Sequence, residues 1–110
     1  MVKTFHQGDI VILDFHPQAG REQSGRRPAV IISNDFFNSL SNIAIVCPIT
    51  STKNKFPLNF LLDSQTTTQG SILCQHVKSL DLLARNAIFV EKLPEESFKE
   101  VQEIVFSQMT

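Results

Sequence analysis

Short apolar runs separated by turn residues limit what this chain can fold into. None is longer than about eight residues, and each is bounded by glycine, proline or clusters of Ser and Asn. Runs of this length that are rich in β-branched residues are typical of strands rather than helices. The sequence predicts strands at residues 9–15, 28–33, 43–50, 58–62 and 71–78, and a last short strand at residues 87–90.

The end of the chain has a helical pattern instead. Apolar residues recur there at spacings of three and four, which places them on one face of a helix. The residues on this face are Phe98, Val101, Ile104, Val105 and Met109. Pro94 suits the first turn of this helix, and Glu95 and Glu96 suit the positive end of its dipole.

These elements predict one domain over residues 1–110, because the sequence contains no linker or repeat. A chain of 110 residues can bury enough surface to fold without a disulfide or a metal ion. The expected fold is mainly β, a small and strongly bent antiparallel sheet or open barrel with a C-terminal helix packed on it. Pro48 cannot donate to a β-ladder, so we expect a bulge or an edge at that point of its strand.

The net charge of -1 excludes a protein that coats nucleic acid by bulk charge, but it hides an uneven distribution. Residues 1–90 contain eight basic and six acidic side chains, whereas residues 91–110 contain two basic and five acidic ones. Much of that C-terminal acidity lies on the predicted helix. A mildly basic body therefore carries an acidic terminal segment.

The sequence has no signal peptide and no apolar run near the ~20 residues that cross a bilayer, so we expect a cytoplasmic protein that binds no membrane. Cys47 and Cys74 each lie inside an apolar run, without a zinc-ligand spacing. We interpret them as buried, inert thiols and expect neither a metal site nor a disulfide.

The segment at residues 20–28 (GREQSGRRP) is the most informative polar stretch. It carries Arg21, Arg26 and Arg27 together with Glu22 and Gln23, between two predicted strands. Guanidinium groups match phosphate oxygens in pairs, so such a loop on a rigid scaffold is a candidate anion site. The alternative is a solvated basic loop in which Glu22 bridges the arginines.

Two more polar segments lie at the ends of predicted strands. Residues 50–53 (TSTK) place hydroxyls and an ammonium group where they either hold phosphate oxygens or form a turn. His76 precedes Lys78 by two residues. An imidazole in that position is either a proton carrier or a structural residue.

Together these segments resemble, in order and spacing, the MazF/PemK toxins of bacterial toxin-antitoxin modules. The resemblance rests on GDIV at 8–11, DFHP at 14–17, GREQSGRRPAVIIS at 20–33, CPITS at 47–51, HVKSL at 76–80 and AR at 84–85. Its most specific part is the pattern E-Q-x-G-x-R-P, followed by the P-I-T-S strand end. The resemblance covers nearly the whole chain.

The resemblance implies a sequence-selective, metal-independent endoribonuclease on an SH3-like barrel, with no cofactor. It also implies a homodimer held inactive by a MazE-like antitoxin with an acidic, disordered tail. In the MazF branch the catalytic pair falls on Arg27 and Thr50. The PemK-like branch places Arg and Asp where this chain has Leu73 and Gln75, so the MazF-type site is expected. Relatives typically carry Gln at the position of His76.

Metal-free RNA cleavage uses the 2′-hydroxyl of the RNA as nucleophile and leaves a 2′,3′-cyclic phosphate and a 5′-hydroxyl. The protein must move protons and stabilise charge on the phosphate oxygens. We expect Arg27 to clamp the scissile phosphate and Thr50 to bond its oxygen. Either Glu22 or His76 carries a proton in this hypothesis.

The expected substrate is single-stranded RNA, whose base edges are accessible to loops around the site. The expected RNA-binding residues are Arg21, Gln23, Ser51, Thr52, Lys53, Asn54, Lys55 and Lys78. Two other classes stay open. One is a toxin of the same fold that poisons DNA gyrase through its terminal helix, and the other is a non-catalytic SH3-like binding module.

Overall fold

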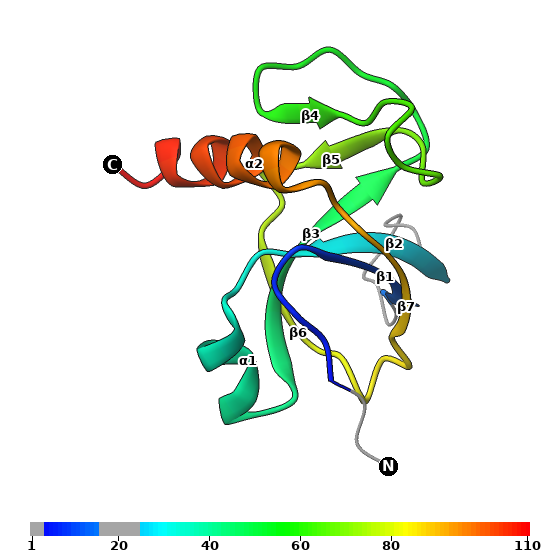
Figure 1. Cartoon of the computed structure of the whole chain (residues 1–110), viewed down its shortest axis with the longest axis vertical. Coiled ribbons are helices and arrows are strands. Elements are labelled where there is room, and N and C mark those ends of the chain that lie inside the picture. The colour runs from blue at the N-terminus through cyan, green and yellow to red at the C-terminus, as the bar shows by residue number, and fades with distance from the viewer. Residues whose placement is uncertain (1–3, 16–24) are drawn as a thin grey trace.

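The computed structural model describes residues 4–15 and 25–110 of the chain (Figure 1). In chain order the first elements are β1 (Asp9–Asp14), β2 (Arg26–Ile31), α1 (Asp35–Leu40) and β3 (Ile43–Thr50). The remaining elements are β4 (Asn59–Leu61), β5 (Ser71–Leu73), β6 (Lys78–Asp81), β7 (Ile88–Lys92) and α2 (Glu95–Ser107). The mainly β class with a C-terminal helix is confirmed.

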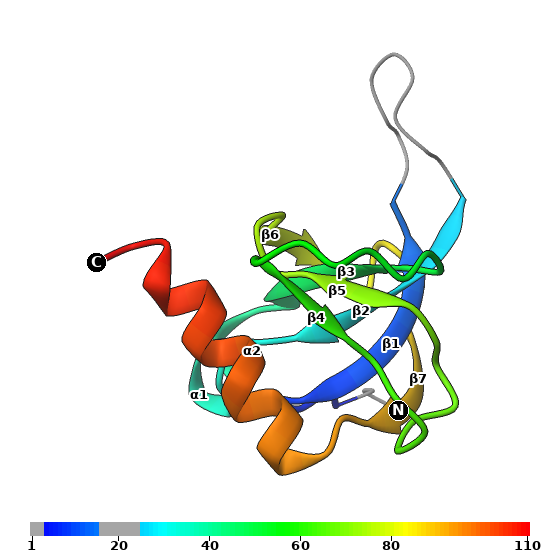
Figure 2. The same cartoon turned by 90° about the horizontal axis from the view of Figure 1, so that it is seen from above.

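The strands form one antiparallel, strongly bent sheet in the order β4-β5-β3-β2-β1-β7, with β6 paired to β3 beside this path (Figure 2). Along the side of β3 away from β2, Ile43–Val46 pair with β6, and Ile49 and Thr50 pair with β5. Pro48 lies between these two ladders. The expected interruption at Pro48 therefore takes the form of a change of partner strand inside the sheet.

Alternate side chains of a strand point to opposite faces of the sheet, and buried apolar clusters lie on both faces. One face contributes Ile10, Val30 and Cys47 to a cluster completed by Val101 and Val105 of α2. The other face contributes a second apolar cluster, whose strand residues include Val11, Leu13, Ala29, Ile31, Ala44 and Val46. The sheet thus has an α2 face and an opposite face, which we call the inner face.

The two cysteines are buried as predicted, both within the cluster under α2. Contact with the Cys74 thiol and burial both raise the pKa of Cys47. Cys47 therefore stays in the protonated, unreactive form, in agreement with the interpretation of an inert thiol.

The structure corrects the strand predicted at residues 71–78. The amide of His76 donates to the carbonyl oxygen of Leu73 at 3.0 Å, so the chain turns after β5 and starts again as β6 at Lys78. The two pieces pair with different parts of β3. The register along β3 shifts by three residues between Ile49↔Ile72 and Val46↔Lys78, and the turn between β5 and β6 takes up the extra residues.

Helix α1 was not predicted. It has six residues, too few to show a helical period, but it carries the usual signal of a helix start. The side chain of Asn34 caps it by accepting from the amide of Phe37 at 2.8 Å, and Asp35 lies in its first turn.

Helix α2 confirms the predicted terminal helix, with two corrections. Pro94 is its N-cap, one position before the first turn. Met109 lies beyond the last helical residue, Ser107, and is two-thirds exposed, so it takes no part in the buried face. No helix among the described residues is long and apolar enough to cross a membrane.

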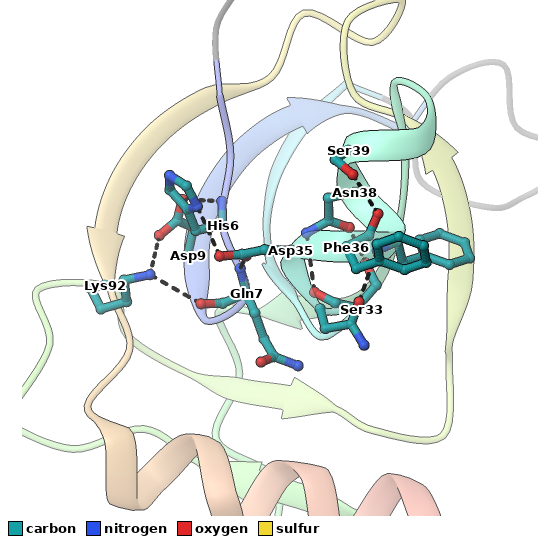
Figure 3. Close-up of polar contacts among 11 residues, drawn as sticks. His6, Gln7, Asp9, Ser33, Asp35, Phe36, Asn38, Ser39 and Lys92 are labelled. Carbon is teal, nitrogen blue, oxygen red and sulfur yellow. Dashed lines mark hydrogen bonds and ion pairs between the residues drawn. The ribbon is translucent and has the colours of Figure 1, made fainter.

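Charged groups at the start of β1 pair within the chain (Figure 3). The carboxylate of Asp9, only 3% exposed, accepts from Lys92 Nζ at 2.7 Å and from the His6 amide at 2.8 Å. Asp35 accepts from the Gln7 amide at 3.0 Å and lies 3.2 Å from His6 Nδ1. Through these contacts the segment before β1, residues 6–8, is bound to α1 and β7.

Candidate active site at the end of the inner face

The two residues expected to form the catalytic pair lie at the same end of neighbouring strands. Arg27 is the second residue of β2, and Thr50 is the last of β3. The strands pair as Ala29↔Pro48 and Val30↔Cys47, and this register, continued by two residues, sets Arg27 opposite Thr50. Residues directly opposite in an antiparallel pair project from the same face of the sheet.

That face is the inner one. Arg27 is paired with Leu13, a member of the inner apolar cluster. Thr50 is paired on its other side with Ser71 of β5. Four neighbouring strands therefore contribute Leu13, Arg27, Thr50 and Ser71 to one row, in which an apolar residue is followed by a cation and two hydroxyls.

Lys78 lies on the same face, because it is opposite Val46 of the inner cluster. Its ammonium group lies over the ring of Phe15, 5.7 Å from the centroid, within the range of a cation–π contact. Sequence reasoning proposed Lys78 as an RNA contact but overlooked Phe15. The signal was the aromatic residue at the end of the first predicted strand.

Arg26 belongs to a different environment, although it adjoins Arg27 in the sequence. Its side chain forms an ion pair with Asp14, with Nη1 3.0 Å from Oδ1. Nη2 also donates to the carbonyl oxygens of Ile12 at 3.2 Å and Asn86 at 2.8 Å. Of the arginines expected to form an anion site in segment 20–28, Arg26 thus binds the end of β1 and the turn before β7.

The segment after Thr50 carries most of the other predicted RNA contacts, and all of them are exposed: Ser51, Thr52, Lys53, Asn54 and Lys55. The Thr50 hydroxyl accepts from the Thr52 amide at 3.4 Å, a long contact that leaves its own hydrogen free to donate. This exposed segment therefore begins at the predicted catalytic hydroxyl.

His76 lies in the connection between β5 and β6 and is exposed. Since β5 pairs with the end of β3 and β6 with its first half, this connection passes β3 near Pro48. The connection is hydrogen-bonded to the residue before β4 and to the end of α2: the Cys74 amide donates to the Leu58 carbonyl at 3.2 Å, and the Cys74 carbonyl accepts from Gln108 Nε2 at 2.8 Å. Arg21, Glu22 and Gln23 lie outside the described residues.

The electrostatics of the inner face favour an anionic ligand. Among residues 4–15 and 25–110, neither Arg27 nor Lys78 belongs to an ion pair. Both cations are half-buried on this face, and a phosphate group bound there would neutralise positive charge that has no carboxylate partner among the described residues. Within the same residues, no three His, Cys, Asp or Glu side chains are grouped as a metal site requires.

Comparison with known proteins gives a consistent result. Residues 6–108 match the family described as the PemK-like, MazF-like toxin of type II toxin-antitoxin systems. The chain is 35% identical over 80 residues to the endoribonuclease toxin MazF of Escherichia coli K12, and this alignment covers 73% of this chain and 71% of that protein. It is 33% identical to the endoribonuclease toxin ChpB of the same strain, over 92% of this chain and 94% of that protein.

Solved structures extend the similarity to the fold. The crystal structure of MazF (Form-I) from Deinococcus radiodurans superposes with a TM-score of 0.89 at 32% identity, over 98% of both chains. The MazE-MazF structure (Form-II) from the same organism gives a TM-score of 0.87 at 32% identity and covers 99% of this chain and 100% of that chain. The bent sheet with its C-terminal helix is therefore the MazF arrangement.

Proposed function

We propose that this chain, which belongs to the family of PemK-like, MazF-like toxins of type II toxin-antitoxin systems and is an endoribonuclease toxin, cuts single-stranded RNA without a metal ion. In this proposal Arg27 and Thr50 are the catalytic pair. The observation that supports this site is the arrangement of the two residues. They lie on one face of neighbouring strands, and Arg27 is in no ion pair among the described residues.

The reaction needs no external nucleophile. The 2′-oxygen of the RNA gives up its proton and bonds to the adjacent phosphorus, while the 5′-oxygen leaves and takes up a proton. The products are a 2′,3′-cyclic phosphate and a 5′-hydroxyl. Negative charge grows on the non-bridging phosphate oxygens in the transition state, and stabilising that charge is commonly the largest catalytic contribution.

Arg27 suits this task because its planar guanidinium group can donate two parallel hydrogen bonds to one phosphate. Thr50 adds a hydroxyl donor from the neighbouring strand. Arginine stays protonated at all ordinary pH values and is therefore a poor proton acceptor. The proton steps fall to Glu22 or His76 in this proposal. Of the two, His76 is the one among the described residues, where it is exposed in the connection between β5 and β6.

Recognition of RNA follows from the exposed groups around this pair. Arg21, Lys53, Lys55 and Lys78 supply cations for backbone phosphates. Ser51 supplies a hydroxyl beside Thr50. Gln23, Thr52 and Asn54 supply donors and acceptors for base edges, which are accessible in single-stranded RNA.

Partners follow from the same family membership. Solved relatives include MazF together with MazE, and this chain has an antitoxin of that kind as its partner. We propose that the toxin works as a homodimer in the cytoplasm. Large apolar side chains that are more than half exposed support contact with another protein chain: Phe36, Leu40, Leu83, Ile88, Phe89, Phe106 and Met109.

Purified protein incubated with a long RNA in excess EDTA tests the proposal. We expect discrete cuts with 5′-hydroxyl ends, and we expect Arg27→Ala to abolish them without changing the thermal melt. The pH–rate profiles of His76→Ala and Glu22→Gln identify the proton carrier, because removing it changes the profile.

A folded protein that cuts no RNA under these conditions contradicts the proposal. Inhibition of DNA gyrase in place of RNA cleavage would favour the gyrase poison of the same fold. Full biological function in Arg27→Ala would favour a non-catalytic binding module.

A further inference from the structure

The hydroxyl of Ser71 holds the exposed segment that begins at Thr50. Ser71 is completely buried as the first residue of β5, directly opposite Thr50. Its Oγ donates to the carbonyl oxygen of Thr52 at 2.9 Å and accepts from the amide of Asn54 at 3.1 Å. One side chain therefore ties two backbone groups of the neighbouring segment to the sheet.

Additional contacts keep the same segment in place. The carbonyl oxygen of Asn54 accepts from the Phe56 amide at 3.0 Å and from Asn59 Nδ2 at 3.1 Å. Asn54 is thus held at its amide by β5 and at its carbonyl by β4. The side chains of residues 52–55, by contrast, stay exposed.

The residue before Ser71 shows how closely β5 approaches Thr50. Gly70 has φ of +118°, a conformation that side chains rarely adopt, and a Cβ at this position would overlap the carbonyl oxygen of Thr50. The start of β5 therefore lies directly against the backbone of the predicted catalytic threonine. Movement of β5 here would move Thr50 and the segment after it together.

On the basis of the proposed function, we propose that Ser71 is a positioning residue that determines how tightly, and at which sequences, RNA binds. Thr50 itself is held by the pairing of β3, whereas Thr52 and Asn54 depend on the Ser71 hydroxyl. Without that hydroxyl Thr52 and Asn54 sample more positions in the free protein. RNA binding must then order them, and this entropy cost lowers the affinity for RNA. The effect falls on KM and on sequence discrimination more than on kcat.

Ser71→Ala tests this role, with Ser33→Ala as the matched control. Ser33 is also nearly buried, and its hydroxyl accepts from the Ile45 amide of the same strand β3 at 2.9 Å, at the end of the strand remote from Thr50. Loss of one hydrogen-bonding hydroxyl corresponds to a change of up to about tenfold in an equilibrium constant. We expect Ser71→Ala to raise KM for RNA about five- to tenfold with kcat within about threefold, and Ser33→Ala to change neither.

Two further measurements separate a positioning role from general destabilisation. Amide hydrogen exchange at Asn54 should be faster in Ser71→Ala than in Ser33→Ala, even where the two variants melt at the same temperature. Ser71→Thr keeps the hydroxyl and should restore KM and the choice of cleavage sites. If Ser71→Ala does not fold, Ser71→Cys, whose thiol is a weak hydrogen-bonding group, takes its place with the same expectations.

The outcomes distinguish this proposal from the proposed function. A wild-type protein that cuts no RNA overturns both. Normal cutting by the wild type, with the same KM and cut sites in folded Ser71→Ala, overturns the role of Ser71 alone. Equal increases in KM for Ser71→Ala and Ser33→Ala also overturn it, because they would reflect stability rather than position.

Discussion

Arg26 and Arg27 are adjacent in the sequence, yet they serve two different regions of the molecule. Arg26 projects from β2 on the side of Asp14, where a carboxylate and two backbone carbonyls accept from it. Arg27 projects on the inner face, opposite Leu13, and the β2–β3 register continued by two residues points it toward Thr50. Alternation along one strand therefore assigns one arginine to structure and leaves the other for a ligand.

The same division applies to other charges of the sheet. Asp9 and Glu91, like Arg26, have partners within the chain, and these contacts connect loops to strands. Arg27 and Lys78 on the inner face belong to no ion pair among the described residues. Charges paired within the chain connect its loops and strands, whereas a cation without a carboxylate partner retains its capacity to bind phosphate.

Exchanging each arginine for lysine gives the largest expected effect and tests this division directly. Arg27→Lys keeps the charge but loses the paired donors, so kcat should fall about 10²-fold with an unchanged melting temperature. Arg26→Lys loses its carbonyl contacts, so its melting temperature should fall by a few degrees with unchanged kcat. Cleavage kinetics and thermal melts of both variants provide the measurement.

A loss of activity in Arg26→Lys as large as that in Arg27→Lys would break the comparison. It would mean that both arginines act on RNA and that the contacts of Arg26 with Asp14 are incidental.

Lys92→Met tests the charges that are paired within the chain, and we expect an effect on stability of intermediate size. Asp9 is nearly buried and would keep only the His6 amide as partner among the contacts described above, so stability should fall by about 1–3 kcal/mol. Denaturant unfolding measures the change, and the activity of the folded protein should not change. His6→Ala is the control, because the contact of its Nδ1 with Asp35 is exposed on both sides, so its loss should change the free energy of unfolding much less than Lys92→Met does.

Glu91→Gln gives the smallest expected effect and depends on pH. Burial would raise the pKa of Glu91, but hydrogen bonds from the side chains and amides of Thr68 and Thr67 outweigh it and lower the pKa. A lowered pKa means that the carboxylate stabilises the fold above its ordinary pKa of 4.5 and that this contribution is lost as the pH falls below that value.

The free energy of unfolding of the wild type should therefore exceed that of Glu91→Gln by about 1 kcal/mol or less at neutral pH. This difference should shrink at acid pH. Urea unfolding at several pH values measures it. A difference that grows on acidification would contradict the lowered pKa.

Prediction from the sequence succeeded where the signal was local. Runs of apolar, β-branched residues located most strands, and the three-and-four spacing located α2. It failed at residues 71–78, because nothing local shows that β5 and β6 pair with different parts of β3. It missed α1 because six residues do not establish a period.

The candidate site shows the same limit. The motifs pointed to Arg27 and Thr50, and spacing alone indicated that both lie near strand ends. Ser71 looked like an ordinary strand residue, since its two hydrogen bonds join residues that are 17 and 19 positions apart. Such contacts depend on strand pairing that the sequence does not reveal.

The sequence by itself determined the mainly β class, the terminal helix, the family and the residue types available for cleaving RNA. The tertiary structure decided which arginine has partners in the chain, how β3 is divided between β5 and β6, and what holds the segment after Thr50. The physical reason is that strand propensity and motifs are local, whereas register and the pairing of charges arise from contacts between distant residues.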